Sequence, residues 1–141
     1  MKNILPLLCC FLLLTTCQNG TSKEIKATTI LETTKSWDGS LLPEIEGQPK
    51  VTISKVIIPP QKELPKHLHP VITTGLLQKG ELTITTIDNK QKVLKAGEVI
   101  VEVSNTMNYG KNSGDKDAEI LVFYIGSENA PVTILKDATN H

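Results

Sequence analysis

Residues 59–84 read PPQKELPKHLHPVITTGLLQKGELTI, and this stretch carries the strongest structural signal in the chain. It holds His67 and His69, one residue apart and flanked by prolines. Residues i and i+2 of a β-strand face the same side, so the two imidazoles are predicted to converge on one point. Convergent imidazoles can bind one metal ion, but paired histidines on the surface of a strand are about as common. The pair alone leaves both interpretations open.

Short β-type segments fill most of the chain on both sides of this stretch. Gly, Asn and Asp residues separate them, and Asp88-Asn89 suits a tight hairpin turn because both residues tolerate positive φ. No segment after the N-terminal region has convincing helical periodicity. The pattern therefore predicts an all-β sandwich or barrel. Strands are expected at residues 28–34, 51–58, 71–77, 81–87, 93–94, 98–103, 119–125 and 132–135.

The first residues of the chain have the form of an export signal. Lys2 precedes an apolar run at 4–14, which is too short to span a bilayer and contains Pro6. Residues 14–17, LTTC, resemble a bacterial lipobox, in which the signal is removed before a cysteine that is then lipidated, here Cys17. The alternative is an ordinary signal peptide in which this cysteine is incidental.

The domain organisation follows from this interpretation. We expect a lipoprotein-type signal peptide at residues 1–16, a polar tether at 17–27, a barrel at 28–135 and a C-terminal tail at 136–141. The protein would be exported and anchored by its N-terminal lipid to a membrane of the cell envelope. No cysteine follows Cys17, so the domain would contain no disulfide and must be stabilised by its core.

The charge of the chain argues against nucleic acid as a partner. Its formal net charge is zero, and all 15 basic residues are lysines. A neutral chain has no long-range field to attract a polyanion, and without arginine it lacks the planar fork that grips phosphate with two hydrogen bonds. Its only expected membrane contact is through the lipid on Cys17.

Residues 59–84, followed by KAGEVIVEVSNTMNYGKN at 95–112, resemble the two motifs of the cupin superfamily. The first motif has a histidine pair and a closing glycine, and the second has an opening glycine and a final asparagine. The resemblance covers about residues 28–135 and implies a small β-barrel of the jelly-roll type. The matching residues are His67, His69, Gly80, Gly97 and Asn112.

Two of the family's four usual metal ligands are replaced in this chain. Thr73, seven residues before Gly80, stands where the family has glutamate, and Asn108, eleven residues after Gly97, stands where it has a third histidine. A hydroxyl and an amide oxygen are poor ligands for a divalent transition metal. Glu102 is the best replacement and would complete a two-histidine, one-carboxylate set of the kind that binds iron. The alternative is that Glu102 faces solvent or a lysine, as most glutamates do.

Three further polar residues, Thr73, Tyr109 and Asn112, are expected around the pocket. Tyr124 is expected in the core with one hydrogen bond. Trp37 is expected over the barrel as a lid, or in a dimer contact.

The leading hypothesis for function is an exported cupin that binds an unidentified small molecule at a degenerate metal site. One divalent iron, manganese, nickel or zinc ion would bind His67 and His69, with Asn108 or Glu102, or no metal would bind. The second hypothesis is a metal-dependent enzyme of the dioxygenase or isomerase type that uses the same residues. The third is a structural lipoprotein of the envelope. Whether the chain is an enzyme stays open at this point, as does a homodimer.

Overall fold

A computed structural model of the chain describes residues 24–136. The predicted signal peptide at 1–16, Cys17, most of the tether and residues 137–141 of the tail lie outside these described residues. Within residues 24–136, no helix has the length and apolar character needed to cross a membrane.

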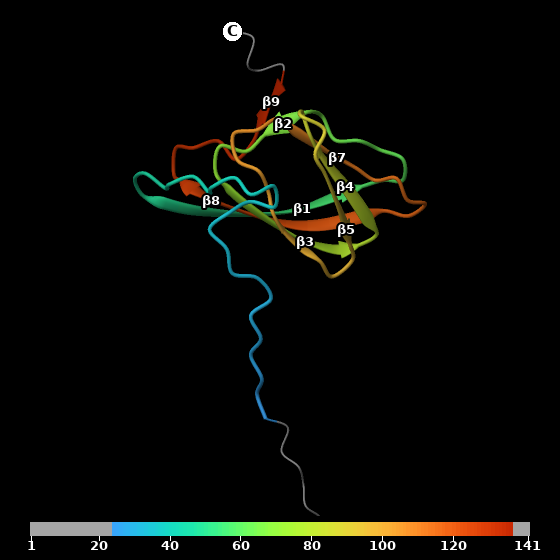
Figure 1. Cartoon of the computed structure of the whole chain (residues 1–141), viewed down its shortest axis with the longest axis horizontal. Helices are drawn as coiled ribbons and strands as arrows, with labels where there is room; N and C mark the ends of the chain where they lie inside the picture. The colour runs from blue at the N-terminus through green and yellow to red at the C-terminus, as the bar shows by residue number, and fades with distance from the viewer. Residues whose placement is uncertain (1–23, 137–141) are drawn as a thin grey trace, which may run out of the picture.

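The described chain folds into two antiparallel sheets that face each other (Figure 1). The first sheet has the order β1-β8-β3-β6 and the second has the order β5-β4-β7-β2-β9. The predicted all-β barrel is therefore confirmed. The strands of the first sheet are β1 (Pro49–Ile58), β8 (Ala118–Ser127), β3 (Ile72–Lys79) and β6 (Val99–Val101). Those of the second are β5 (Gln91–Lys95), β4 (Glu81–Thr86), β7 (Asn108–Lys111), β2 (His67–Leu68) and β9 (Ile134–Leu135).

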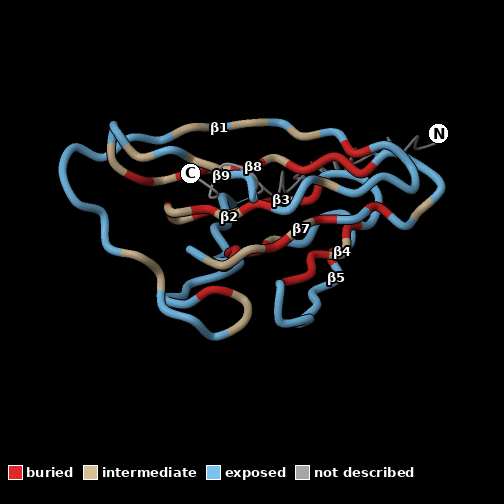
Figure 2. Tube along the Cα trace, turned by 90° about the horizontal axis from the view of Figure 1, so that it is seen from above, coloured by how far each residue is buried: buried red, intermediate tan, exposed pale blue. Residues whose placement is uncertain are grey.

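The core lies between the sheets and follows the alternation of each strand (Figure 2). In β8, Ile120, Val122 and Tyr124 point inward and are buried, while the residues between them are half-buried. Leu77 and Leu94 approach from other strands and are fully buried. Because aliphatic side chains dominate this core, the few polar groups that enter it need a specific explanation.

The predicted hairpin turn is confirmed between β4 and β5. Asn89 has a φ of 63°, and the Thr86 N–H donates to the Lys90 carbonyl oxygen at 3.0 Å. The Thr86 hydroxyl also donates to the Asp88 carboxylate. Positive φ is the property for which an asparagine is favoured at such a turn.

One predicted strand is absent from the described chain, and two short strands were not predicted. Residues 28–34 form no strand: the Thr34 carbonyl oxygen accepts the Leu42 N–H at 3.1 Å, but in the described chain no strand pairs with this segment. The strands β2 and β7 were missed, since two and four residues are too few to show a sequence pattern. Residues 24–34 instead run outward from the barrel as an extended segment (Figure 1).

Candidate metal and ligand site

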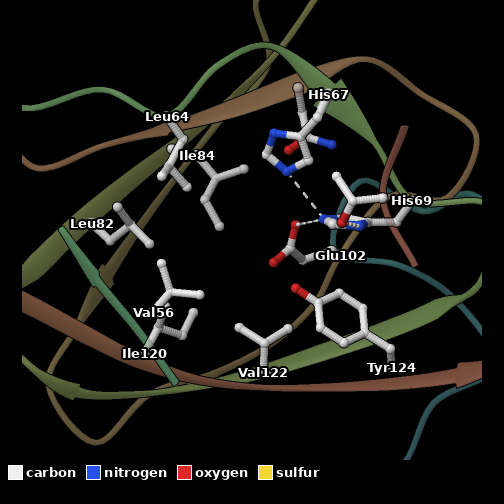
Figure 3. Close-up of a pocket in the computed structure, with 13 residues that line it drawn as sticks. Val56, Leu64, His67, His69, Leu82, Ile84, Glu102, Ile120, Val122 and Tyr124 are labelled. Atoms are coloured by element: carbon white, nitrogen blue, oxygen red, sulfur yellow. Dashed lines mark hydrogen bonds and ion pairs between the residues drawn. The ribbon is translucent and has the colours of Figure 1, made fainter. Parts of the chain in front are cut away.

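A cavity of about 70 Å³ lies between the sheets, at the end where β2 and β9 meet the barrel (Figure 3). One part of its wall is aliphatic and includes Leu82 and Val122. The opposite part is polar. The polar lining residues are His67, His69, Glu102, Asn108, Tyr124 and Thr133.

The imidazoles of His67 and His69 meet inside this cavity. Their Nε2 atoms are 3.1 Å apart, and both side chains are buried. The Nδ1 atom of His67 donates to the carbonyl oxygen of Pro65 at 2.7 Å, and that of His69 donates to the carbonyl oxygen of Val132 at 2.7 Å. A carbonyl can only accept a hydrogen bond, so both Nδ1 atoms carry hydrogen.

These hydrogen bonds fix the chemical state of the two Nε2 atoms. Burial lowers the pKa of both His67 and His69, which favours the neutral rings at neutral pH. A neutral imidazole with hydrogen on Nδ1 has a bare lone pair on Nε2. Two lone pairs therefore face each other across 3.1 Å, and they repel unless a proton or another cation lies between them.

Glu102 supplies an acidic group to the same place (Figure 3). Its side chain is buried, and its Oε2 lies 3.6 Å from Nε2 of His69. Burial raises the pKa of the Glu102 carboxyl to about 7, and the nearby His67 acts in the opposite direction. A buried carboxyl with no lysine beside it is costly to ionise, so its position favours a bound cation.

The chain holds Glu102 in place from two sides. Its backbone N–H donates to the carbonyl oxygen of Thr73 at 2.8 Å, and its carbonyl oxygen accepts the Ser36 hydroxyl at 2.8 Å. The backbone N–H of Trp37 donates to the neighbouring Val101 carbonyl oxygen at 2.9 Å. Ser36 and Trp37 thus fix the end of β6, from which the Glu102 carboxylate enters the cavity.

Glu102 lies opposite Thr73 in the ladder between β3 and β6. The β3–β6 register pairs Thr74 with Val101 and Gly75 with Ile100, so the next pair is Thr73 with Glu102. Thr73 is the position at which the sequence pattern lacks its glutamate. The Glu102 carboxylate therefore enters the cavity from the end of β6, the strand that pairs with β3, at the position opposite Thr73.

Two donor separations in the cavity are compatible with ligation of one divalent transition metal ion. Two ligand atoms about 2.1 Å from one ion are at most about 4.2 Å apart. The Nε2 atom of His69 lies within this limit of both Nε2 of His67, at 3.1 Å, and Oε2 of Glu102, at 3.6 Å. Within residues 24–136, no group of three or more His, Cys, Asp or Glu side chains is already arranged around one metal position. In this trio the carboxylate faces His69 and would have to turn toward His67 to complete the set.

Asn108 and Tyr124 complete the polar wall. Asn108 is paired with His67 across β2 and β7, and its Nδ2 donates to the Thr106 carbonyl oxygen at 3.1 Å. The Tyr124 ring lies 5.5 Å from that of His69, and its hydroxyl points toward Glu102 (Figure 3). Burial raises the pKa of Tyr124, so its hydroxyl keeps its proton and can donate a hydrogen bond. The alternation of 119–125 could have placed Tyr124 on the cavity wall, whereas no sequence signal pointed to Thr133.

The expectation that Thr73, Tyr109 and Asn112 surround the pocket needs correction, because none of them lines the cavity. Thr73 is buried, and its hydroxyl donates to the Val71 carbonyl oxygen. Tyr109 is partly exposed and lies under Lys66 Nζ, 5.6 Å from the ring centroid. Asn112 donates to the carbonyl oxygens of Ile58 and Lys116, so its role is to hold loops.

Comparison with known proteins agrees with this architecture. The sequence profile of the cupin domain matches residues 54–124. Oxalate oxidase in complex with glycolate is 29% identical with a TM-score of 0.52, and the match covers 60% of this chain and 45% of that one. No curated protein sequence matches the chain.

Two further structures share the fold alone. A conserved protein with a double-stranded β-helix domain from Klebsiella pneumoniae is 21% identical with a TM-score of 0.52, and the match covers 67% of this chain and 89% of that one. DMSP lyase DddQ from Ruegeria pomeroyi is 18% identical with a TM-score of 0.54, at coverages of 64% and 45%. The chain thus spans less than half the length of the matched oxalate oxidase and DMSP lyase chains.

Proposed function

The chain belongs to the cupin domain family, and we propose that its barrel binds a small organic molecule beside one divalent metal ion held by His67, His69 and Glu102. The observation that carries this proposal is the pair of bare Nε2 lone pairs, 3.1 Å apart in a buried cavity. A cation between them removes their repulsion and also stabilises the ionised form of Glu102. Asn108 offers a weaker, neutral ligand in its amide oxygen, because its hydrogen bond to the Thr106 carbonyl oxygen uses Nδ2 and leaves Oδ1 available.

The ligand set suggests which metals would bind and what they would supply. Two imidazoles and a carboxylate suit iron, and they also suit manganese, nickel or zinc. Such an ion acts as a Lewis acid that polarises an oxygen atom of a bound molecule. The chain itself contributes the aliphatic wall, which excludes water, and the Tyr124 hydroxyl, which can donate a hydrogen bond to the ligand.

The cavity limits the ligand to a small molecule. About 10–15 Å³ of cavity volume accommodates one water-sized group. A cavity of about 70 Å³ therefore holds roughly five or six non-hydrogen atoms. Its polar end suits a hydroxyl or carboxyl oxygen, and its aliphatic end suits a short hydrocarbon part.

A metal-dependent enzyme is the second candidate function. It is supported by the 29% identity to oxalate oxidase, whose complex holds glycolate, a molecule of the size that this cavity accommodates. Glycolate and oxalate are therefore suitable first probes for binding and turnover.

The test is metal analysis of the purified full-length chain. We expect close to one equivalent of iron, manganese, nickel or zinc, and its loss in His67→Ala. Glu63→Gln is the matched control, because Glu63 is exposed and should leave the metal content unchanged. A wild-type chain that takes up no metal after incubation with each ion, or a His67→Ala chain that retains it, would refute the proposed centre.

We further propose that the domain is exported and anchored to an envelope membrane through a lipid on Cys17. The support is the charged start, the short apolar run and the LTTC sequence at 14–17. Replacing Cys17 with serine should release the protein from the membrane fraction of expressing cells. Undiminished membrane association of this variant, together with an unchanged mass, would contradict lipidation at this position.

A further inference from the structure

The cavity beside the two imidazoles has two chemically different ends (Figure 3). His67, His69, Glu102 and the Tyr124 hydroxyl lie at the polar end. The wall away from them carries no polar side chain, and we call it the apolar end. Its defining residues are Leu64, Leu82, Ile84, Gly110, Ile120 and Val122.

The apolar end favours a hydrocarbon group over a polar one. Leu82 and Val122 are 2% and 4% exposed, so water has little access to this wall. A hydrocarbon group placed there gains dispersion contacts with the wall and gives up no hydrogen bond. A polar group placed there loses its hydrogen bonds to water and finds no partner.

Gly110 makes room at the apolar end. It lies in β7, across from Ile84 of β4. A Cβ atom at this position would lie 3.3 Å from Cδ1 of Leu82 and 3.5 Å from Cδ1 of Leu64. The φ angle of Gly110 is not positive, so its backbone conformation is open to alanine. A side chain here would therefore fill the space that a ligand's tail would occupy.

The lining of the cavity also restricts the charge of the ligand. No lysine of residues 24–136 lines it, and the chain contains no arginine. Ionised Glu102 offsets one of the two positive charges of a divalent ion beside His67 and His69. One carboxylate on the ligand balances the positive charge that is left, whereas a second carboxylate would be buried without a partner.

The polar end suits two oxygen atoms on neighbouring carbons. Two imidazoles and a carboxylate leave positions open on a metal ion. Burial keeps the proton on the Tyr124 hydroxyl by raising its pKa, so this group can donate to a ligand oxygen at the same end. In a cavity with room for roughly five or six non-hydrogen atoms, a carboxyl group and an adjacent carbon with its oxygen leave space for a tail of only about one carbon atom.

We propose that the ligands of this site are short-chain 2-hydroxy or 2-oxo monocarboxylic acids, with the alkyl group at the apolar end against Val122 and Gly110. This inference rests on the proposed function, because it places the carboxylate beside the ion held by His67, His69 and Glu102. It adds the charge, the length and the tail of the ligand. Oxalate, which has two carboxylates and no alkyl group, falls outside this class.

The test is titration calorimetry of the zinc-loaded full-length chain with glycolate, lactate, 2-hydroxyhexanoate and oxalate. The better-bound enantiomer of lactate should bind about fourfold more tightly than glycolate, because one more methyl group is buried. 2-Hydroxyhexanoate should bind at least about tenfold more weakly than lactate, because its tail is too long for the cavity. Oxalate has as many non-hydrogen atoms as lactate, and it should also bind at least about tenfold more weakly because its second charge has no partner.

Two variants test the apolar end itself. Gly110→Ala should abolish the preference for lactate while the affinity for glycolate stays within about twofold of wild type, because only the tail meets the added methyl group. Val122→Thr keeps the volume but adds a hydroxyl, and it should reduce the same preference. Val71→Thr is the matched control, because Val71 is also 4% exposed but does not line the cavity. Circular dichroism checks that each variant folds, and either apolar-end variant suffices if the other does not.

Metal analysis of each titrated sample separates this inference from the proposed metal centre. A chain that holds no metal overturns both. A chain that holds one equivalent of zinc overturns this inference alone if it binds none of these acids, or if it binds glycolate or oxalate as tightly as lactate. A lactate preference that Gly110→Ala and Val122→Thr leave as in wild type overturns it as well. If oxalate extracts the metal, tartronate, a 2-hydroxy acid with two carboxylates, takes its place under the same criterion.

Discussion

Replacing Glu102 with glutamine is the most informative single change, because it has opposite effects with and without metal. The variant keeps the size and shape of the protonated carboxyl but cannot ionise. In the metal-free protein, the ionised carboxylate is buried beside two neutral imidazoles, and burial raises its pKa from 4.5 to about 7. The wild-type fold therefore carries an electrostatic cost at high pH that the variant lacks.

The size and the pH range of this cost follow from linkage. Below about pH 4.5 the Glu102 carboxyl is protonated in both the folded and the unfolded chain, so it does not change the free energy of unfolding. Between pH 4.5 and about 7, the unfolded chain releases the proton while the folded chain retains it, and the free energy of unfolding falls. At about 1.4 kcal/mol per pH unit, the loss above pH 7 reaches about 3 kcal/mol. For a domain of this size, that corresponds to a difference in Tm of roughly 10 °C.

The histidines contribute a separate pH dependence. The pKa of His67 and of His69 is lowered by burial, so stability is lost as the pH falls below the ordinary value of 6.5 and the unfolded chain takes up protons. This loss should occur in both the wild-type protein and Glu102→Gln, although the Glu102 charge raises the pKa of His67 in the wild type alone. The difference between the two proteins therefore reports the carboxyl together with its interaction with His67.

Urea unfolding of the metal-free proteins between pH 4 and 8.5, with a chelator present, measures this difference. Fluorescence of Trp37, the single tryptophan, is the probe. We expect equal stabilities near pH 4 and a more stable Glu102→Gln at pH 8, while added zinc should stabilise the wild type more than the variant. Glu63→Gln is the control, and it should follow the wild type throughout. A Glu102→Gln protein that is less stable than wild type at pH 8 without metal would refute this account of the carboxyl.

Two further changes test the walls of the site. Asn108→His places an imidazole across β2 and β7 from His67, so zinc affinity measured by titration calorimetry should rise at least about tenfold, with no rise in a His67→Ala background. An unaltered affinity in the single variant would mean that this side chain does not reach the metal position. Asn112→Ala removes hydrogen bonds of 2.8 Å to both Ile58 and Lys116 and should cost about 2 kcal/mol in urea unfolding without changing metal content, whereas loss of metal would show that the residue does serve the site.

Much of the fold was predictable because its long strands alternate. Residues 51–58 and 119–125 showed their alternation in the sequence, and the structure contains β1 and β8 there. Residues 28–34 have strand composition, yet a strand forms only where a second strand accepts its hydrogen bonds. The short strands β2 and β7 exist for the converse reason, since pairing with neighbours brought close by the fold overrides a weak local preference.

The site was partly predictable for similar reasons. The spacing of His67 and His69 indicated that their side chains would meet, and the structure brings the two Nε2 atoms to 3.1 Å. The hydrogen bonds that fix their tautomers could not be predicted, because one comes from Val132, 63 residues along the chain. Tyr109 and Asn112 were misplaced because their positions relative to the cavity depend on sheet register.

The Thr73–Glu102 pair shows why counting along a motif gives an incomplete view of such a site. Counting along one strand reports a lost glutamate at Thr73, and from this the site was interpreted as degenerate. Side chains at paired positions of an antiparallel ladder lie side by side on the same face, so either strand can supply a group to the same region. The Glu102 N–H bond to the Thr73 carbonyl oxygen, at 2.8 Å, places these two residues across from each other. A carboxylate can thus move to the facing strand without changing the character of the cavity: the sequence indicated Glu102 as a candidate, and the register of β3 with β6 explains its position opposite Thr73.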